Sequence, residues 1–140
     1  MKRETWEQAV AFHGHACPGL AIGLRAAEVV RQRLQPDEKD PMSLVCVAEN
    51  SGCPIDGIQI LLGCTAGKSN LKFRLTGAPG MALSFFNQNS GESLRLALKK
   101  EVQRSDDPAR QLKWVLQAGE EELFDIDKPP YPCPEGGIVA

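Results

Sequence analysis

Both histidines of the chain and one of its five cysteines lie within five residues of one another, at His13, His15 and Cys17. Imidazole nitrogen and thiolate sulfur are the donors that borderline-soft divalent metals such as Zn²⁺ prefer. Residues two apart in an extended segment point to the same side, so these three side chains could converge on one ion. Gly14 and Gly19 relieve the backbone where such convergence needs unusual angles. The spacing predicts a transition-metal site, with zinc favoured by ligand type and Fe²⁺ or Ni²⁺ as alternatives.

The position of Cys17 suggests a second kind of chemistry. Pro18 suits the first position of a helix, because its missing N–H would be unpaired there anyway. The helix dipole and the free N–H groups would then stabilise a Cys17 thiolate, which is the form that binds metal and attacks as a nucleophile. A thiol or sulfur-transfer protein that uses Cys17 is therefore an alternative to metal binding, with Cys53 or Cys64 resolving the intermediate.

Two later cysteines could complete a metal site. Cys64 follows a helix that ends at Gly63, in a loop that can present a side chain, and Cys53 opens the same helix. The loop is not a phosphate-binding loop, because the pattern GxxxxGK[ST] would need a glycine where the chain has Leu62. The metal-ligand candidates are His13, His15, Cys17, Cys53 and Cys64.

A small metal-dependent enzyme is a further alternative. Three protein ligands would leave one coordination position open, in which a bound water becomes acidic. Asp56, Lys68 or Glu49 could then move protons or hold an anionic substrate, while Cys17 could act as the nucleophile. The catalytic candidates are Cys17, Asp56 and Lys68.

Composition limits the remaining possibilities. The chain has 140 residues and a formal net charge of −2, which favours one domain and gives no basic surface for nucleic acid. No apolar run approaches a membrane span, and early charges argue against a signal peptide, so we expect a cytoplasmic protein. The odd number of cysteines favours metal binding, catalysis or burial over disulfides, with Cys46 as a core residue and Cys133 as an incidental or partner-facing thiol.

Apolar periodicity predicts an α+β fold. Helices are expected over 4–12, 18–34, 55–62, 91–103 and 108–119, and strands over 44–48, 71–75 and 81–86. The last two strands should form an antiparallel hairpin, and the first should be buried within the sheet. A mixed, largely antiparallel sheet covered by helices on one face follows. The domain is expected over 1–127, with an irregular proline-rich tail over 128–140.

Several segments resemble, in the same order, the signature blocks of the FmdE family, which takes its name from a component of formylmethanofuran dehydrogenase. They are FHGHACPGLAIG at 12–23, Glu49-Asn50 with Cys53 and Asp56, Ile58-Gln59, and GCTAGK at 63–68. The likeness spans about residues 5–100.

This resemblance implies an α+β core that is often dimeric and holds a metal through His15, Cys17 and Cys64, with His13, Cys53 and Asp56 nearby. It also implies an accessory or subunit-like role with a molybdenum or tungsten oxidoreductase of one-carbon metabolism. Longer family members add a cysteine-rich zinc module after the core. Residues 101–140 contain only Cys133, too few ligands for that module.

Overall fold

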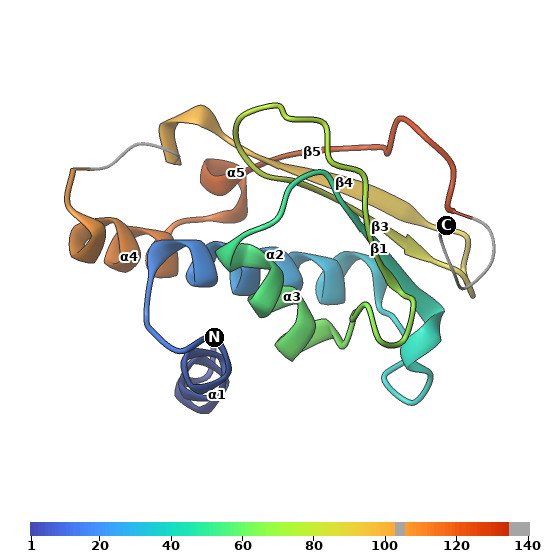
Figure 1. The fold of residues 1–140 in the computed structure, drawn as a ribbon, viewed down its shortest axis with the longest axis horizontal. Helices are drawn as coiled ribbons and strands as arrows, with labels where there is room; N and C mark the ends of the chain where they lie inside the picture. The colour runs from blue at the N-terminus through green and yellow to red at the C-terminus, as the bar shows by residue number, and fades with distance from the viewer. Residues whose placement is uncertain (103–105, 135–140) are drawn as a thin grey trace.

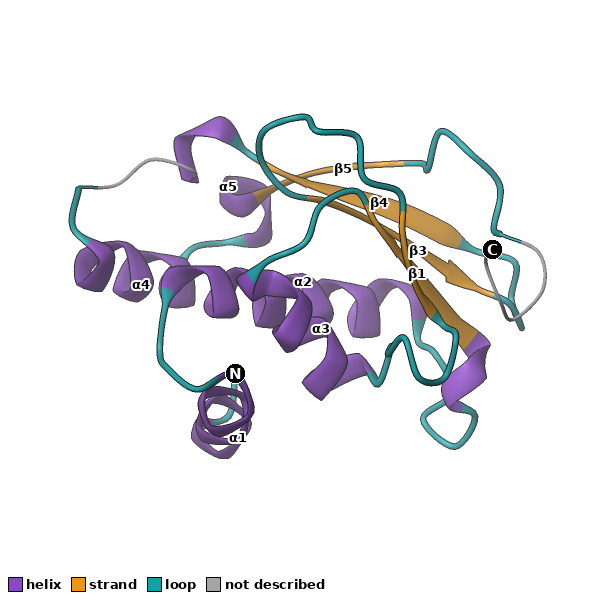
Figure 2. Cartoon of the chain, in the orientation of Figure 1, coloured by secondary structure: helices purple, strands orange, loops and turns teal. Residues whose placement is uncertain are grey.

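The computed structural model describes residues 1–102 and 106–134. Its helices are α1 (Arg3–His13), α2 (Pro18–Leu34), α3 (Cys53–Leu62), α4 (Pro108–Gln117) and α5 (Glu120–Leu123). Its strands are β1 (Leu44–Ala48), β2 (Leu71–Phe73), β3 (Ala82–Asn87), β4 (Ser93–Leu98) and β5 (Phe124–Asp127). The strands form one layer, and α1 to α4 lie on one side of it (Figures 1 and 2). Among the described residues, no helix is long and apolar enough to cross a membrane.

The sheet has five strands in the order β2-β1-β3-β4-β5. The pair β1 and β2 is parallel, while the other three pairs are antiparallel. All five residues of β1 are buried, as expected for a strand with a neighbour on each side. The predicted α+β class, with a mixed and largely antiparallel sheet, is therefore confirmed.

The predicted hairpin between 71–75 and 81–86 is wrong. β2 pairs with β1 in parallel, with Leu71 opposite Cys46, and β3 pairs with the other side of β1. The reason is α3, which connects β1 to β2 as a crossover and brings the chain back in the same direction. β2 also ends at Phe73, and β3, which begins at Ala82, lies on the opposite side of β1.

The predicted helix over 91–103 is also wrong, and residue 103 lies outside the described residues. The segment forms β4 and then a short 3₁₀ helix, Lys100–Val102. Leu94 and Leu96 are buried while Arg95 between them faces the other side, which is the two-residue period of a strand. Leucine, alanine and lysine favour helices by propensity, but the pairing with β3 outweighs that preference. The elements α5 and β5 were not predicted.

The core lies between α2 and the sheet. Small residues of α2 such as Ala26 and Ala27 are fully buried and let this helix approach the strands closely. Opposite them lie the inner side chains of β3 and β4, including Leu83, Phe85 and Leu96. Cys46 of β1 is fully buried in this cluster, as predicted for a small core residue.

The described part of the proline-rich tail lies across the other face of the sheet. Tyr131 and Cys133 pack on a small apolar cluster formed by Val45, Val47 and Phe86. The Tyr131 hydroxyl donates a hydrogen bond to Ser84 Oγ at 3.1 Å. Residues 128–134 contain no helix or strand, and they cover apolar surface that β1 and β3 would otherwise expose.

An ion pair lies beside this tail. Arg95 donates from Nε to Glu49 Oε2 at 2.7 Å and from a terminal nitrogen to Oε1 at 3.0 Å. The hydrogen bond from Arg95 holds the pKa of Glu49 below its usual value, although burial acts in the opposite direction. A carboxyl group with a lowered pKa stabilises the fold above its unfolded pKa and loses that contribution as the pH falls through its folded pKa.

Replacing Glu49 with glutamine should therefore lower stability most at neutral pH. We expect a loss of about 1–3 kcal/mol there, as for other hydrogen bonds to charged groups. The difference from the parent protein should shrink as the pH falls below the ordinary glutamate pKa of about 4.3 and then through the lower pKa of Glu49 in the folded protein, because the parent carboxylate becomes protonated over that range. Urea unfolding at a series of pH values measures it. A difference that stays constant with pH would contradict this account of the Glu49–Arg95 pair.

Candidate metal centre

Four of the five predicted ligands meet at one end of the helical layer. One ligand atom from each of His13, His15, Cys17 and Cys53 lies within 4.8 Å of the others. His13 is the last residue of α1, Cys17 is the N-cap of α2, and Cys53 is the first residue of α3. The cluster therefore forms where the end of α1 meets the beginnings of α2 and α3.

The turn between α1 and α2 brings the two histidines together. Gly14 ends α1 with φ +101°, a left-handed conformation that residues with a side chain rarely adopt. The ring centroids of His13 and His15 lie 4.5 Å apart as a result. The backbone relief expected at Gly14 is thus observed.

Direct contact between the backbones of α2 and α3 brings Cys53 to Cys17. A Cβ atom added to Gly23 would lie 2.1 Å from the Pro54 carbonyl oxygen, and one added to Gly19 would lie 2.7 Å from Cys53 Cβ. On α3, a Cβ at Gly57 would lie 2.7 Å from the amide nitrogen of Leu24. Sequence reasoning assigned no role to Gly23 or Gly57. The signal was the four-residue spacing of Gly19 and Gly23 on one helix face.

Asp56 holds the ring of His13. His13 Nδ1 and Asp56 Oδ2 are 2.7 Å apart, and Gln59 donates to the other carboxylate oxygen at 2.8 Å. Because an ionised carboxylate only accepts, the neutral ring of His13 would donate from Nδ1 and keep its lone pair on Nε2. That nitrogen is 3.6 Å from Cys17 Sγ and so faces the cluster. A histidine oriented in this way by a carboxylate is typical of metal sites.

Two helix N-termini supply positive potential to the sulfur atoms. The amide N–H of Leu20 donates to Cys17 Sγ at 3.4 Å, and α3 begins at Cys53 itself. Such termini favour thiolate over thiol. Burial nevertheless raises the pKa of Cys53, and the neighbouring Cys17 raises it further. Two thiolates this close repel each other, which favours a cation between them.

The structure does not bring Cys64 or Lys68 to this cluster. Cys64 follows the other end of α3, about 15 Å along the helix from Cys53. It is fully buried, its thiol donates to the Leu44 carbonyl at 3.8 Å, and burial raises its pKa to about 12. Lys68 is exposed in the turn beside it. Of the other predicted catalytic residues, Cys17 and Asp56 lie at the cluster, whereas Glu49 pairs with Arg95.

The loop after α3 is organised by Asn70. This side chain is fully buried and donates to the carbonyl oxygens of Pro41 at 2.8 Å and Leu44 at 3.2 Å. Its own oxygen accepts from the Thr65 amide at 2.9 Å. The glycine-bounded loop that carries Cys64 thus has a structural role, because it connects the end of α3 to β1 and β2. Sequence reasoning did not identify Asn70.

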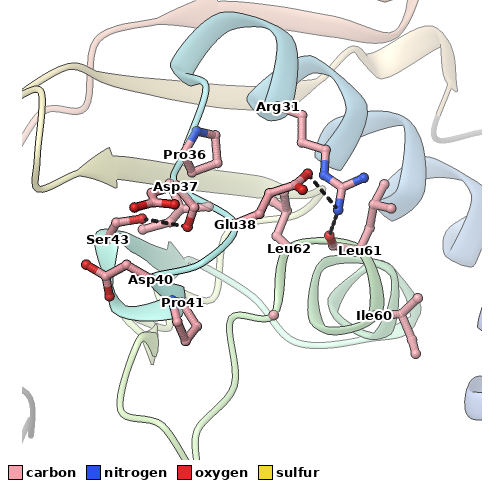
Figure 3. A pocket seen from close by; sticks show the side chains of 12 residues that line it. Arg31, Pro36, Asp37, Glu38, Asp40, Pro41, Ser43, Ile60, Leu61 and Leu62 are labelled. Atoms are coloured by element: carbon pink, nitrogen blue, oxygen red, sulfur yellow. Dashed lines mark hydrogen bonds and ion pairs between the residues drawn. The ribbon is translucent and has the colours of Figure 1, made fainter.

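A cleft of about 300 Å³ lies beside this loop, and none of the four clustered residues lines it (Figure 3). Arg31 reaches across it from α2 and donates to the Leu61 carbonyl at 2.7 Å, near Glu38. The carboxylates on its rim are exposed. Within the described residues, the cluster at Cys17 remains the one group with metal-ligand geometry.

The fold and the cluster together define a class: a small α+β domain that assembles a cysteine and histidine group at the meeting point of two helix N-termini. The family model described as "FmdE, Molybdenum formylmethanofuran dehydrogenase operon" matches residues 12–125. The chain belongs to the FmdE family.

Two known proteins are similar to this chain. The crystal structure of a tungsten formylmethanofuran dehydrogenase FmdE-like protein from Syntrophus aciditrophicus has the same fold, with a TM-score of 0.60 and 22% identity over 90% of this chain and 70% of that one. A probable S-adenosyl-L-methionine-binding protein from Archaeoglobus fulgidus is 34% identical over 68 residues, which are 46% of this chain and 19% of the relative. This chain therefore spans less than a fifth of that relative.

Proposed function

We propose that this protein binds one transition-metal ion, preferably zinc, through His13, His15, Cys17 and Cys53. The observation that carries the proposal is the mutual approach of the four donor atoms within 4.8 Å. Two sulfur and two nitrogen donors match the ligand set of tetrahedral zinc. The carboxylate of Asp56 behind His13 is a second feature expected of a metal ligand.

The four donors differ in how firmly they are held. His13 is oriented by Asp56, and Cys53 is packed against Gly19, whereas His15 is exposed in the loop. His15 is therefore the ligand that an incoming molecule can displace most easily. A bound metal would act as a Lewis acid on the molecule that replaces His15. The remaining three ligands would keep the metal in place.

Metal analysis of protein purified without chelator tests the proposal. We expect about one metal ion per chain, as for a mononuclear four-ligand site. Cys17→Ser and Cys53→Ser should each lose it. Cys133→Ser, on the other face of the sheet, is the matched control and should keep it. Protein that contains no metal and takes up no zinc on titration would overturn the proposal.

The Cys64→Ser variant tests whether the metal is held by this ligand set or by the set implied by family resemblance, which includes Cys64. Because Cys64 is buried beside Leu44 and away from the cluster, we expect this variant to retain its metal. Loss of metal from Cys64→Ser, with the fold intact by circular dichroism, would instead make Cys64 a ligand.

Asp56→Asn should weaken metal binding without abolishing it. The asparagine side chain has no charge, so the hydrogen bond that it accepts from His13 Nδ1 is no longer charge-assisted. Loss of such a partner costs about 10- to 100-fold in metal affinity. Competition with a chromophoric chelator measures the change, and Asp125→Asn at the exposed edge of the sheet is the control. Equal affinities in both variants would show that Asp56 does not support the site.

We further propose an accessory or subunit-like role in the cytoplasm with a molybdenum or tungsten oxidoreductase, supported by the description of the family. Co-elution of the purified chain with the catalytic component of such an oxidoreductase from the same organism tests this role. A homodimer, expected from family resemblance, would appear as twice the chain mass in light scattering.

A further inference from the structure

Two of the four clustered side chains are thiols, those of Cys17 and Cys53. The sulfur atoms of Cys17 and Cys53 lie within 4.8 Å of each other. Both residues are partly exposed, so a small oxidant can reach them. We propose that Cys17 and Cys53 form a reversible disulfide on reaction with a low-molecular-weight disulfide, and that its formation releases the metal. The release of metal rests on the proposed function, whereas the disulfide does not.

No other described cysteine can compete for either partner. Cys46 and Cys64 are fully buried in the core between the helices and the sheet. Cys133 lies on the opposite face of the sheet, against Val45 and Phe86. The fold therefore isolates one cysteine pair from the remaining thiols.

The backbone around the pair permits the bond. The sulfurs must move from at most 4.8 Å to the bonding distance of about 2 Å, which rotation of the side chains and a small backbone shift can supply. Cys17 is extended and lies just before α2, at the end of the exposed loop. Cys53 follows Gly52, which has φ +137° and allows the chain to adjust ahead of α3. Neither helix needs to unwind.

The reaction is an ordinary thiol–disulfide exchange in two steps. The Cys17 thiolate attacks one sulfur of the external disulfide, forms a mixed disulfide, and releases one small thiolate. The Cys53 thiolate then attacks the Cys17 sulfur and releases the second small thiolate. The two cysteines are oxidised by two electrons, and the external disulfide is reduced to two thiols.

The disulfide removes two of the four proposed ligands at once. Both thiolates are consumed in the bond, so a metal ion would keep only His13 and His15, which do not form a complete site. A reducing thiol regenerates both ligands. Metal binding at this centre would therefore depend on the thiol–disulfide balance of the surroundings.

The experiment uses the full chain, with and without bound zinc, incubated with oxidised glutathione. Intact mass should fall by two hydrogen atoms per chain, and peptide mapping should show a Cys17–Cys53 crosslink. Zinc should appear in a chromophoric chelator in proportion to the thiols lost, and dithiothreitol should restore binding. Cys133→Ser should behave like the parent protein, while Cys53→Ser should accumulate a glutathione adduct at Cys17.

The outcomes separate the two proposals. A crosslink in a protein that never binds metal would defeat the metal proposal and keep the disulfide. A protein that binds zinc but, when metal-free, gives only glutathione adducts or crosslinks through other cysteines would defeat the disulfide and keep the metal site. Crosslinking with zinc still bound would overturn the coupling between them.

Discussion

Replacing Gly23 with alanine is expected to abolish the proposed metal binding, although all four proposed ligands remain in the sequence. The added Cβ would lie 2.1 Å from the Pro54 carbonyl oxygen, far inside van der Waals contact. The atom it meets belongs to the backbone of α3 and cannot rotate away, so the two helices must separate. Overpacking of this kind costs about 1–3 kcal/mol in stability.

The effect on the metal should exceed the effect on stability. Cys17 belongs to α2 and Cys53 to α3, so separation of the helices directly lengthens the distance between two ligands. Metal coordination tolerates errors of only about 0.2 Å in ligand distance. Gly67→Ala is the matched control, because the nearest atom to its Cβ would be 4.0 Å away.

Metal content, chelator competition and urea unfolding of the two glycine variants give the comparison. We expect Gly67→Ala to bind metal like the parent protein and Gly23→Ala to bind none while remaining folded. Full metal content in Gly23→Ala would mean that the helices can separate without disturbing the ligands, and the assembly described for this site would be wrong.

Replacing Asn70 with aspartate should strongly destabilise the fold, although the two side chains have nearly the same shape. The Asn70 amide group faces the carbonyl oxygens of Pro41 and Leu44, and no solvent reaches it. Aspartate would place a carboxylate oxygen against those two carbonyls and would bury a charge, with the Thr65 amide as the one donor kept from the hydrogen bonds of Asn70. A loss of about 3–5 kcal/mol is expected, as for other buried charges left unpaired.

Asn70→Ala supplies the comparison. It removes the same hydrogen bonds without introducing repulsion, so it should cost less, about 2–3 kcal/mol. Both variants should retain metal at the far end of α3 under conditions where they remain folded. Urea unfolding of both variants and the parent protein measures the order of their stabilities. If the aspartate variant were as stable as the parent, Asn70 would not hold the loop together.

Local signals were sufficient to predict much of the fold. The helix start at Cys17 and Pro18, and the helix end at Gly63, follow from the chemistry of single residues. The pairing of β2 could not be predicted in the same way. Whether residues 71–73 pair with the next strand or with the preceding one depends on where α3 places the chain.

Sequence reasoning identified the members of the cluster that are close together in the chain, and it left the choice open for the distant member. His13, His15 and Cys17 form a local pattern. The choice between Cys53 and Cys64 as the distant ligand depends on which end of α3 meets α2, and periodicity alone does not contain that information. The glycines that fix this contact have no polar atoms, so a search for chemically active side chains does not find them.

The contact between α2 and α3 also bears on how a metal would enter. Gly19, Gly23 and Gly57 let the backbones of the two helices touch, so packing between the helices helps to position Cys17 and Cys53, two of the proposed ligands. Zinc fingers, in contrast, are unfolded until the ion binds. Because helix packing is independent of the ion, we expect metal loading and unloading to leave the architecture intact, so that the same folded molecule could pass through many cycles of metal acquisition and delivery.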